Sequence, residues 1–153
     1  MTHVRLSYAY GASGQPLLGT TIGEKFDQAC AQYAEQDAVV SVHQNIRFTY
    51  KQLQQQVNAF ACSLLKHELK KGDRLAIWSP NCVEWTITQF AAFKAGIILV
   101  NLNPAYKSSE LEYVLNKVSC VGLVIAPAFK TSDYQEILCK IAPELCNSNE
   151  KIL

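Results

Sequence analysis

Apolar side chains recur at helical spacing in two stretches of the first half of the chain. The first stretch begins with Thr21 and Glu24, which have the spacing of a capping box, and it predicts a helix that runs to about Glu35. The second begins with Thr49 and Gln52, which have the same spacing. Its apolar stripe consists of Leu53, Val57, Phe60, Ala61, Leu64 and Leu65. A stripe of this kind is typical of a helix that packs one face on a core.

Two short runs of β-branched and aromatic residues lie between these helices. They are Ala38–Val42 and Ile46–Phe48, and the polar residues that separate them predict a β-hairpin. The segment before the first helix is rich in Gly, Ser and Tyr and has no clear period, so we expect an N-terminal arm over residues 1–20. We expect one α/β body over 21–145 and a disordered polar tail over 146–153.

The second half of the chain alternates between continuous apolar runs and amphipathic segments. The runs predict strands over Arg74–Trp78, Ile97–Leu102 and Val121–Ile125. The segments predict helices over Cys82–Lys94 (closed by Gly96), from a Ser109–Glu112 capping box to about Val118, and from Thr131 or Ser132 to about Ile141. Pro143 is expected to end the ordered part.

Strands joined by connections of this length pair in parallel through crossover helices, so the predicted fold class is α/β. Parallel sheets need helices on both faces and neighbours at their edges. Three strands with two crossover helices supply too few elements to complete such a sheet. We therefore expect a partial sheet that belongs to a larger domain, with possible self-association of copies through the exposed sheet edges.

The composition narrows the function classes. Of the 153 residues, 49% are hydrophobic and 18% are charged, which allows a core and excludes an extensively disordered chain. The formal net charge of +1 gives no field that would attract nucleic acid or an acidic membrane. The longest apolar run, Ala95–Val100, is far shorter than the about 18 residues of a transmembrane helix.

The six cysteines do not form a recognisable framework. Five lie within apolar patterns, namely Cys30, Cys62, Cys82, Cys120 and Cys139, and Cys146 lies in the polar tail. No CxxC pair is present, and the three histidines are scattered. We therefore expect buried reduced thiols, rather than a disulfide framework, a metal site or a redox centre.

Ligands of open parallel sheets bind beyond the carboxyl ends of the strands. All three strand-to-helix turns of this chain contain proline and lack glycine, which makes them poor cradles for a phosphate. Residues Gly14–Thr21 have the spacing of a P-loop, but Thr20 stands where that loop has its lysine. Residues Gly19–Lys25 resemble a Thr/Gly-rich adenylation loop with an inserted isoleucine and without its proline.

Isolated residues that could contact a ligand have simpler structural roles. They are Arg74, Lys70, Lys71, Lys94, Tyr8, Tyr10, Trp78 and Trp85. Lys94 lies near a helix C-terminus, where a cation is favoured in any case. We expect the tyrosines to pack the arm on the body and the tryptophans to lie in the core. The residues alone therefore assign no catalytic, cofactor-binding or metal-binding side chain.

Several segments, in their order along the chain, resemble the N-terminal part of the AMP-forming acyl-adenylate enzymes. They are Phe48–Leu53, Lys71–Ile77 followed by Pro80-Asn81, and Phe93–Pro104. The segments Ser7-Tyr8, Pro16–Thr21, Asn103–Tyr106 and Glu110–Leu115 resemble more particularly the mitochondrial medium-chain acyl-CoA ligase branch. The resemblance extends from about Ser7 to Leu145, and it identifies 21–145 as an incomplete AMP-binding (adenylation) N-terminal domain.

The resemblance implies an acid–thiol ligase that uses ATP, Mg²⁺ and coenzyme A to activate a fatty acid. Nothing after Pro104 matches the phosphate loop of the family, and its adenine, ribose and lysine motifs would lie beyond Leu153. The resemblance therefore implies an N-terminal fragment that is inactive on its own. It also implies the mitochondrial matrix, although Met1–Gly23 is no convincing transit peptide and a cytoplasmic location is the alternative. The alternative function is a non-catalytic α/β binding or interaction module.

Overall fold

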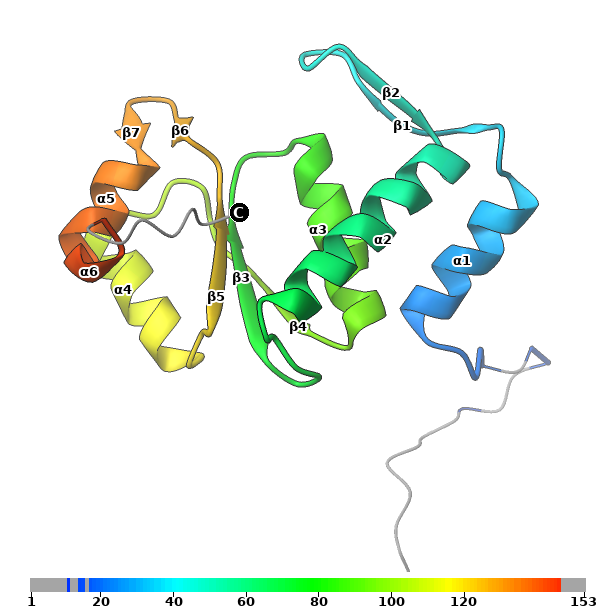
Figure 1. The fold of residues 1–153 in the computed structure, drawn as a ribbon, viewed down its shortest axis with the longest axis horizontal. Helices are drawn as coiled ribbons and strands as arrows, with labels where there is room; N and C mark the ends of the chain where they lie inside the picture. Colours follow the sequence, from blue (N-terminus) through cyan, green and yellow to red (C-terminus); the bar gives the residue numbers. More distant parts are fainter. Residues whose placement is uncertain (1–10, 12–13, 16, 147–153) are drawn as a thin grey trace, which may run out of the picture.

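The computed structural model describes residues 11, 14–15 and 17–146 (Figure 1). Its helices are α1 (Ile22–Gln32), α2 (Tyr50–Lys66), α3 (Val83–Ala95), α4 (Ser108–Lys117), α5 (Tyr134–Ile141) and α6 (Pro143–Cys146). Its strands are β1 (Asp37–Ser41), β2 (Ile46–Thr49), β3 (Arg74–Trp78), β4 (Ile98–Asn101), β5 (Gly122–Ile125), β6 (Ala128–Phe129) and β7 (Ser132–Asp133). The predicted α/β class is confirmed. Most of the predicted arm (1–20) and of the predicted tail (146–153) lies outside the described residues.

The central sheet has the strand order β4-β3-β5, and both pairings are parallel. Ala76 of β3 lies between Val100 of β4 and Leu123 of β5. This geometry follows from the long helical connections, which return the chain to the same end of the sheet before each strand. The predicted hairpin is also confirmed, because β1 and β2 pair antiparallel as a separate sheet.

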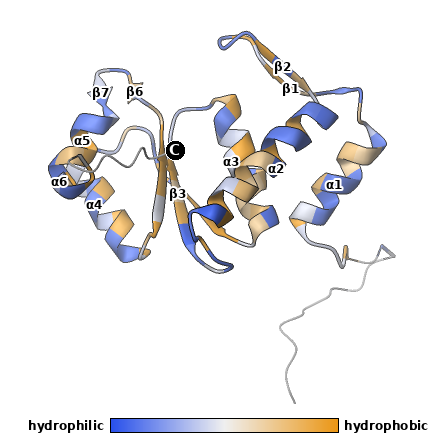
Figure 2. Cartoon of the chain, in the orientation of Figure 1, coloured by the Kyte–Doolittle hydropathy of each residue, from blue (hydrophilic) through white to orange (hydrophobic). Residues whose placement is uncertain are grey.

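Helices cover both faces of the sheet (Figure 1). On one face lie α2 and α3, against which α1 packs, and on the other lie α4 and α5. Strand β3 contributes side chains to the cores on both faces of the sheet. Leu75 belongs to one hydrophobic core, and Ala76 and Trp78 belong to the other. In Figure 2 the central strands are mainly apolar, whereas the helices carry polar and apolar residues on different sides.

Three predicted helix boundaries are confirmed in atomic detail. The hydroxyl of Thr21 accepts the Glu24 amide at 3.2 Å, and the Glu24 carboxylate accepts the Thr21 amide at 2.8 Å. Thr49 and Gln52 form the same reciprocal pair at the start of α2. Gly96 ends α3 in the left-handed region, with φ +71°, which a glycine adopts without steric cost.

Other boundaries differ from the predictions. Helix α1 ends at Gln32 rather than Glu35, because Tyr33 already leaves helical geometry. A cap at Ser109 would start the helix at Glu110, but α4 begins two residues earlier, at Ser108. The cap is Lys107, whose amide donates to the Glu110 carboxylate at 2.9 Å. The predicted Ser109–Glu112 capping box is therefore wrong.

The start of the last predicted helix also differs. Ser132 and Asp133 first form β7 against β6, so the cap of α5 is Asp133, whose carboxylate accepts the Glu136 amide at 2.9 Å. The expected start at Thr131 or Ser132 is wrong. Pro143 does not end the ordered part, because it begins the short helix α6, at a position where its missing N–H costs nothing.

The cysteines agree only in part with the expectation of buried reduced thiols. Cys30 is buried, Cys82 and Cys120 are partly buried, Cys62 is exposed, and all four are free. Cys139 is disulfide-bonded, which the expectation missed. An apolar pattern says nothing about the oxidation state of a cysteine, which explains the error at Cys139, and at Cys62 the pattern did not predict the exposure.

Candidate functional site

The carboxyl ends of the parallel strands form the first candidate site. The helix that follows β3 lies on one face of the sheet, and the helices that follow β4 and β5 lie on the other (Figure 1). Such a reversal leaves a crevice at the strand ends in open α/β sheets, and ligands bind there. In this chain the end of β3, at Trp78, lies at that point.

Two aromatic rings close the strand ends. Trp78 and Tyr134 stack with ring centroids 3.6 Å apart, and both side chains are fully buried. The indole of Trp78 donates to the Asn103 carbonyl at 3.1 Å, and the Tyr134 hydroxyl donates to the Pro104 carbonyl at 2.6 Å. Burial raises the pKa of Tyr134. The stack and these two hydrogen bonds therefore join the turn after β4 to α5.

Three backbone amides in or just after the turns that follow β4 and β5 have partners within the chain. The amide of Ala105 donates to the Asn103 side chain at 2.9 Å, and the amide of Tyr106 donates to the Asn103 carbonyl at 3.0 Å. The amide of Tyr134 donates to the Pro127 carbonyl at 3.1 Å. A phosphate site needs adjacent amides that point at the anion. These three amides are instead used within the fold.

The N-terminus of α3 is covered by the hairpin. The side-chain oxygen of Gln44 accepts the Val83 amide at 2.8 Å, and its amide nitrogen donates to the Glu84 carboxylate at 2.8 Å. This hydrogen bond lowers the pKa of Glu84. Sequence reasoning missed Gln44, because the contact joins residues 39 positions apart and leaves no local signal.

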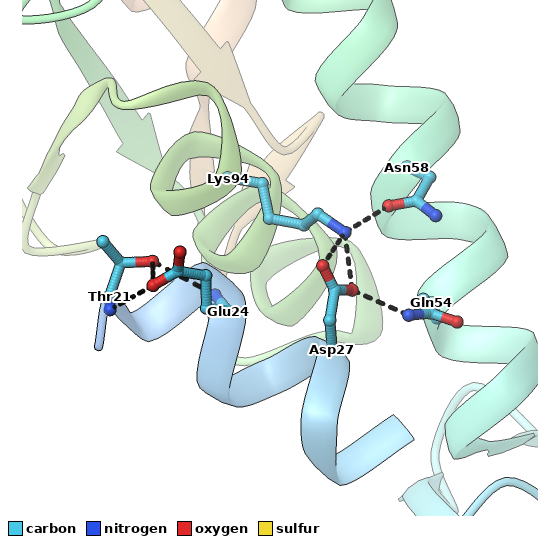
Figure 3. A network of polar contacts seen from close by, with 6 residues as sticks. All are labelled: Thr21, Glu24, Asp27, Gln54, Asn58 and Lys94. Carbon is cyan, nitrogen blue, oxygen red and sulfur yellow. Dashed lines mark hydrogen bonds and ion pairs between the residues drawn. The ribbon is translucent and has the colours of Figure 1, made fainter. Parts of the chain in front are cut away.

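A second polar cluster joins α1, α2 and α3 (Figure 3). The Lys94 ammonium contacts both carboxylate oxygens of Asp27, at 2.6 and 2.7 Å, and the Asn58 side-chain oxygen at 2.7 Å. Gln54 donates to Asp27 at 2.7 Å. Burial would raise the pKa of Asp27, but the hydrogen bonds from Lys94 and Gln54 and the charge of Lys94 outweigh it and lower the pKa.

The cluster holds three helices together instead of binding an anion. A Cβ atom on Gly23 would lie 3.2 Å from Lys94 Cγ, which shows how closely α1 approaches α3 there. The ammonium of Lys94 already has three oxygen partners, so it is not available as the anion contact that the sequence allowed.

The remaining candidates also have structural roles or lie outside the description. Arg74 donates to the Val118 and Ser119 carbonyls at the end of α4, at 2.7 and 3.2 Å. Trp78 is in the core as expected, whereas Trp85 is only partly buried and belongs to neither core, so that expectation was wrong. The backbone amide of Lys70 donates to the Asp73 carboxylate, and the side chains of both Lys70 and Lys71 are exposed. Tyr8 and Tyr10 lie outside the described residues.

The adenylation-like segment Gly19–Lys25 is the cap of α1. The hydroxyls of Thr20 and Thr21 and the Thr21 amide all donate to the Glu24 carboxylate, which lowers the pKa of Glu24. Within residues 11, 14–15 and 17–146, no three His, Cys, Asp or Glu side chains gather as metal ligands.

Comparisons with known proteins give the family. Residues 26–152 match the family model of the AMP-binding enzymes. The chain is 47% identical over 140 residues to the mitochondrial medium-chain acyl-CoA ligase ACSF2 of Mus musculus and 43% identical over 143 residues to that of Homo sapiens. These alignments cover 92% and 94% of this chain but 23% of each relative, so the chain spans about a quarter of the length of the curated relatives it matches.

The fold agrees with this assignment. The N-terminal domain of FACL13 from Mycobacterium tuberculosis superposes with a TM-score of 0.70 at 21% identity, over 86% of this chain and 31% of that chain. No helix in the described part of this chain has the length and apolar character of a membrane span. From the match of residues 26–152 and the fold that accompanies it, this chain belongs to the AMP-binding enzyme family.

Proposed function

We propose that this chain is the N-terminal part of an ATP-dependent fatty acid–CoA ligase that acts on medium-chain acids. The observation that carries the proposal is the 47% identity over 140 residues to a medium-chain acyl-CoA ligase. In the proposed reaction a fatty carboxylate attacks the α-phosphate of ATP to give acyl-AMP and pyrophosphate, and the thiol of coenzyme A then displaces AMP. ATP, Mg²⁺ and coenzyme A are the cofactors proposed for the complete ligase.

We assign this chain the role of scaffold in that reaction. The amides of Ala105, Tyr106 and Tyr134 have acceptors within the fold, and Trp78 stacks on Tyr134. Transition-state charge is stabilised by donors aimed at the reacting groups, and these three amides are already bonded within the fold. The isolated chain is therefore proposed to be inactive, with no catalytic, cofactor-binding or metal-binding residue of its own.

A chimera tests the proposal. The aligned 140 residues of the mouse ligase are replaced by the matching residues of this chain, and acyl-CoA formation is measured with octanoate, ATP, Mg²⁺ and coenzyme A. We expect kcat/KM within about tenfold of the mouse enzyme, since a scaffold segment that folds alike leaves the reacting groups in place. A second chimera, in which the same residues of the mouse ligase are replaced by the human segment, controls for any loss of activity caused by joining two sequences. A soluble, folded chimera without activity, beside an active control, would reject the proposal.

We also propose a mitochondrial location, which the names of the mouse and human relatives support. Uptake of the labelled chain by isolated mitochondria, with protection from added protease, tests it. A chain that remains protease-sensitive outside the organelle would contradict this location and leave the ligase proposal untouched.

A further inference from the structure

Strand β5 has the residues of an interior strand. Its sequence, Gly122–Ile125, contains neither charge nor proline. Val124 packs against the core under α2 and α3, while Leu123 and Ile125 pack against the core under α4 and α5. A strand that is apolar on both faces is typical of the middle of a parallel sheet, and edge strands usually carry charges or proline.

Its position is that of an edge strand. Among the described residues β5 pairs with β3 only. Side chains Leu75 to Trp78 of β3 are at most 2% exposed, whereas every residue of β5 is only partly buried, and Val121 just before it is 57% exposed. The apolar faces of β5 are therefore left partly in water, at a cost in hydrophobic free energy.

A groove of about 1010 Å³ runs beside this edge. Phe60 and Leu64 of α2 contribute to it from one helical layer, and Leu138 and Ile141 of α5 contribute from the other (Figure 1). The groove therefore continues the plane of the sheet between the two helical layers. A β-strand fits between such layers, because sheet and helices already alternate in this way in the rest of the fold.

The backbone at the edge has the polarity that another strand needs. The amide of Ala126, just after β5, donates to the Trp78 carbonyl of β3 at 3.1 Å. In a parallel ladder alternate residues bond to opposite neighbours, and Ala76 of β3 pairs with Leu123, so the amides and carbonyls of Leu123 and Ile125 point away from β3. An incoming strand would satisfy these groups and cover both apolar faces at once.

The length of the relatives indicates where that strand comes from. The chain spans 23% of the mouse ligase and 31% of the FACL13 N-terminal domain, so most of a domain of this fold consists of residues that have no counterpart in the described part. Resting on the proposed function, we infer that the groove beside β5 is the docking site for an apolar β-strand from the remainder of the ligase's N-terminal domain.

Co-purification tests this docking site. The tagged chain Met1–Leu153 is co-expressed with the part of the mouse ligase that follows the aligned residues, and the bound remainder is quantified. Val121→Lys places a charge in the groove and is expected to lower the recovered remainder by about tenfold or more, as a change of about 1.4 kcal/mol would. Val42→Lys on the hairpin, 87% exposed, and Ile98→Lys on the opposite sheet edge, 52% exposed, are expected to change nothing.

Circular dichroism first checks that the three variants fold like the unchanged chain. The site is overturned if a soluble remainder does not co-purify with the unchanged chain, or if Ile98→Lys weakens recovery as much as Val121→Lys. It is also overturned if copies of the chain pair through β5 and exclude the remainder.

Hydrogen exchange gives a second readout that does not need a soluble remainder. In the chimera described above, the amides of Leu123 and Ile125 are expected to exchange about tenfold or more slowly than in the isolated chain. Equal exchange rates would overturn the docking site even if the chimera is an active ligase. Slow exchange in an inactive chimera would instead support the docking site and reject the proposed function.

Discussion

At the residue scale, Lys94 shows how a charged side chain can suggest chemistry that the fold uses for packing. Its place near the end of α3 is evident from the sequence, and a cation there is favoured by the helix dipole. Its partner Asp27 is 67 positions away, so the pair could not be predicted from sequence spacing. The close approach at Gly23, where α1 meets Lys94, likewise has no signature along the chain.

Lys94→Met should lower the free energy of unfolding by about 1 kcal/mol at pH 7. This loss is larger than that expected for an exposed ion pair and smaller than that expected for a fully buried one. The reason is that the side chains of Lys94 and Asp27 are 19% and 41% exposed. Urea unfolding measures the loss. Lys140→Met breaks the exposed Lys140–Glu136 pair of α5 and should cost less than about 0.5 kcal/mol. Equal losses would contradict the role given to the three-helix cluster.

The same variant should change the response to acid. Because the pKa of Asp27 in the fold lies below its ordinary value of 3.8, its ionised form stabilises the protein above that pH. This stabilisation is lost as the pH falls below 3.8 through the folded-state pKa. The difference in free energy of unfolding between Lys94→Met and the unchanged chain should therefore become smaller in acid. Unfolding curves at pH 7 and at low pH check this, and a constant difference would count against it.

At the element scale, boundaries set by neighbouring residues could be predicted and those set by distant residues could not. The caps at Thr21 and Thr49 need partners only three residues away, and both were predicted correctly. The start of α5 depends on the pairing of β6 with β7, and the start of α3 is bonded to Gln44 in the hairpin. These contacts form only in the folded chain.

Gly96→Ala tests the local part of this reasoning. At φ +71° an alanine is strained, and its Cβ would lie 3.0 Å from the side chain of Lys71. We expect a loss of about 1 kcal/mol or more in the free energy of unfolding. Gly19→Ala, where no atom lies within 4 Å of the added Cβ, is the matched control and should be nearly neutral. Equal stability of the two variants in thermal unfolding would show that Gly96 is not needed to end α3.

At the scale of the whole molecule, the sequence predicted the parallel sheet and its strands. It could not show the stack of Trp78 on Tyr134, because two aromatic residues 56 positions apart in a chain carry no mark of contact. Nor could it show the groove beside β5, which depends on how the helical layers lie. The apolar sequence of β5 was visible, and its unpaired edge follows only from the strand order.

The most direct test of the central claim, that this chain supplies scaffold and no reactive group, is ATP–pyrophosphate exchange by purified Met1–Leu153. The assay uses radiolabelled pyrophosphate, ATP, Mg²⁺ and octanoate, with the mouse ligase as positive control. The account predicts a rate equal to that of the blank without protein. Exchange that exceeds the blank, grows with the amount of chain and requires the fatty acid would contradict it.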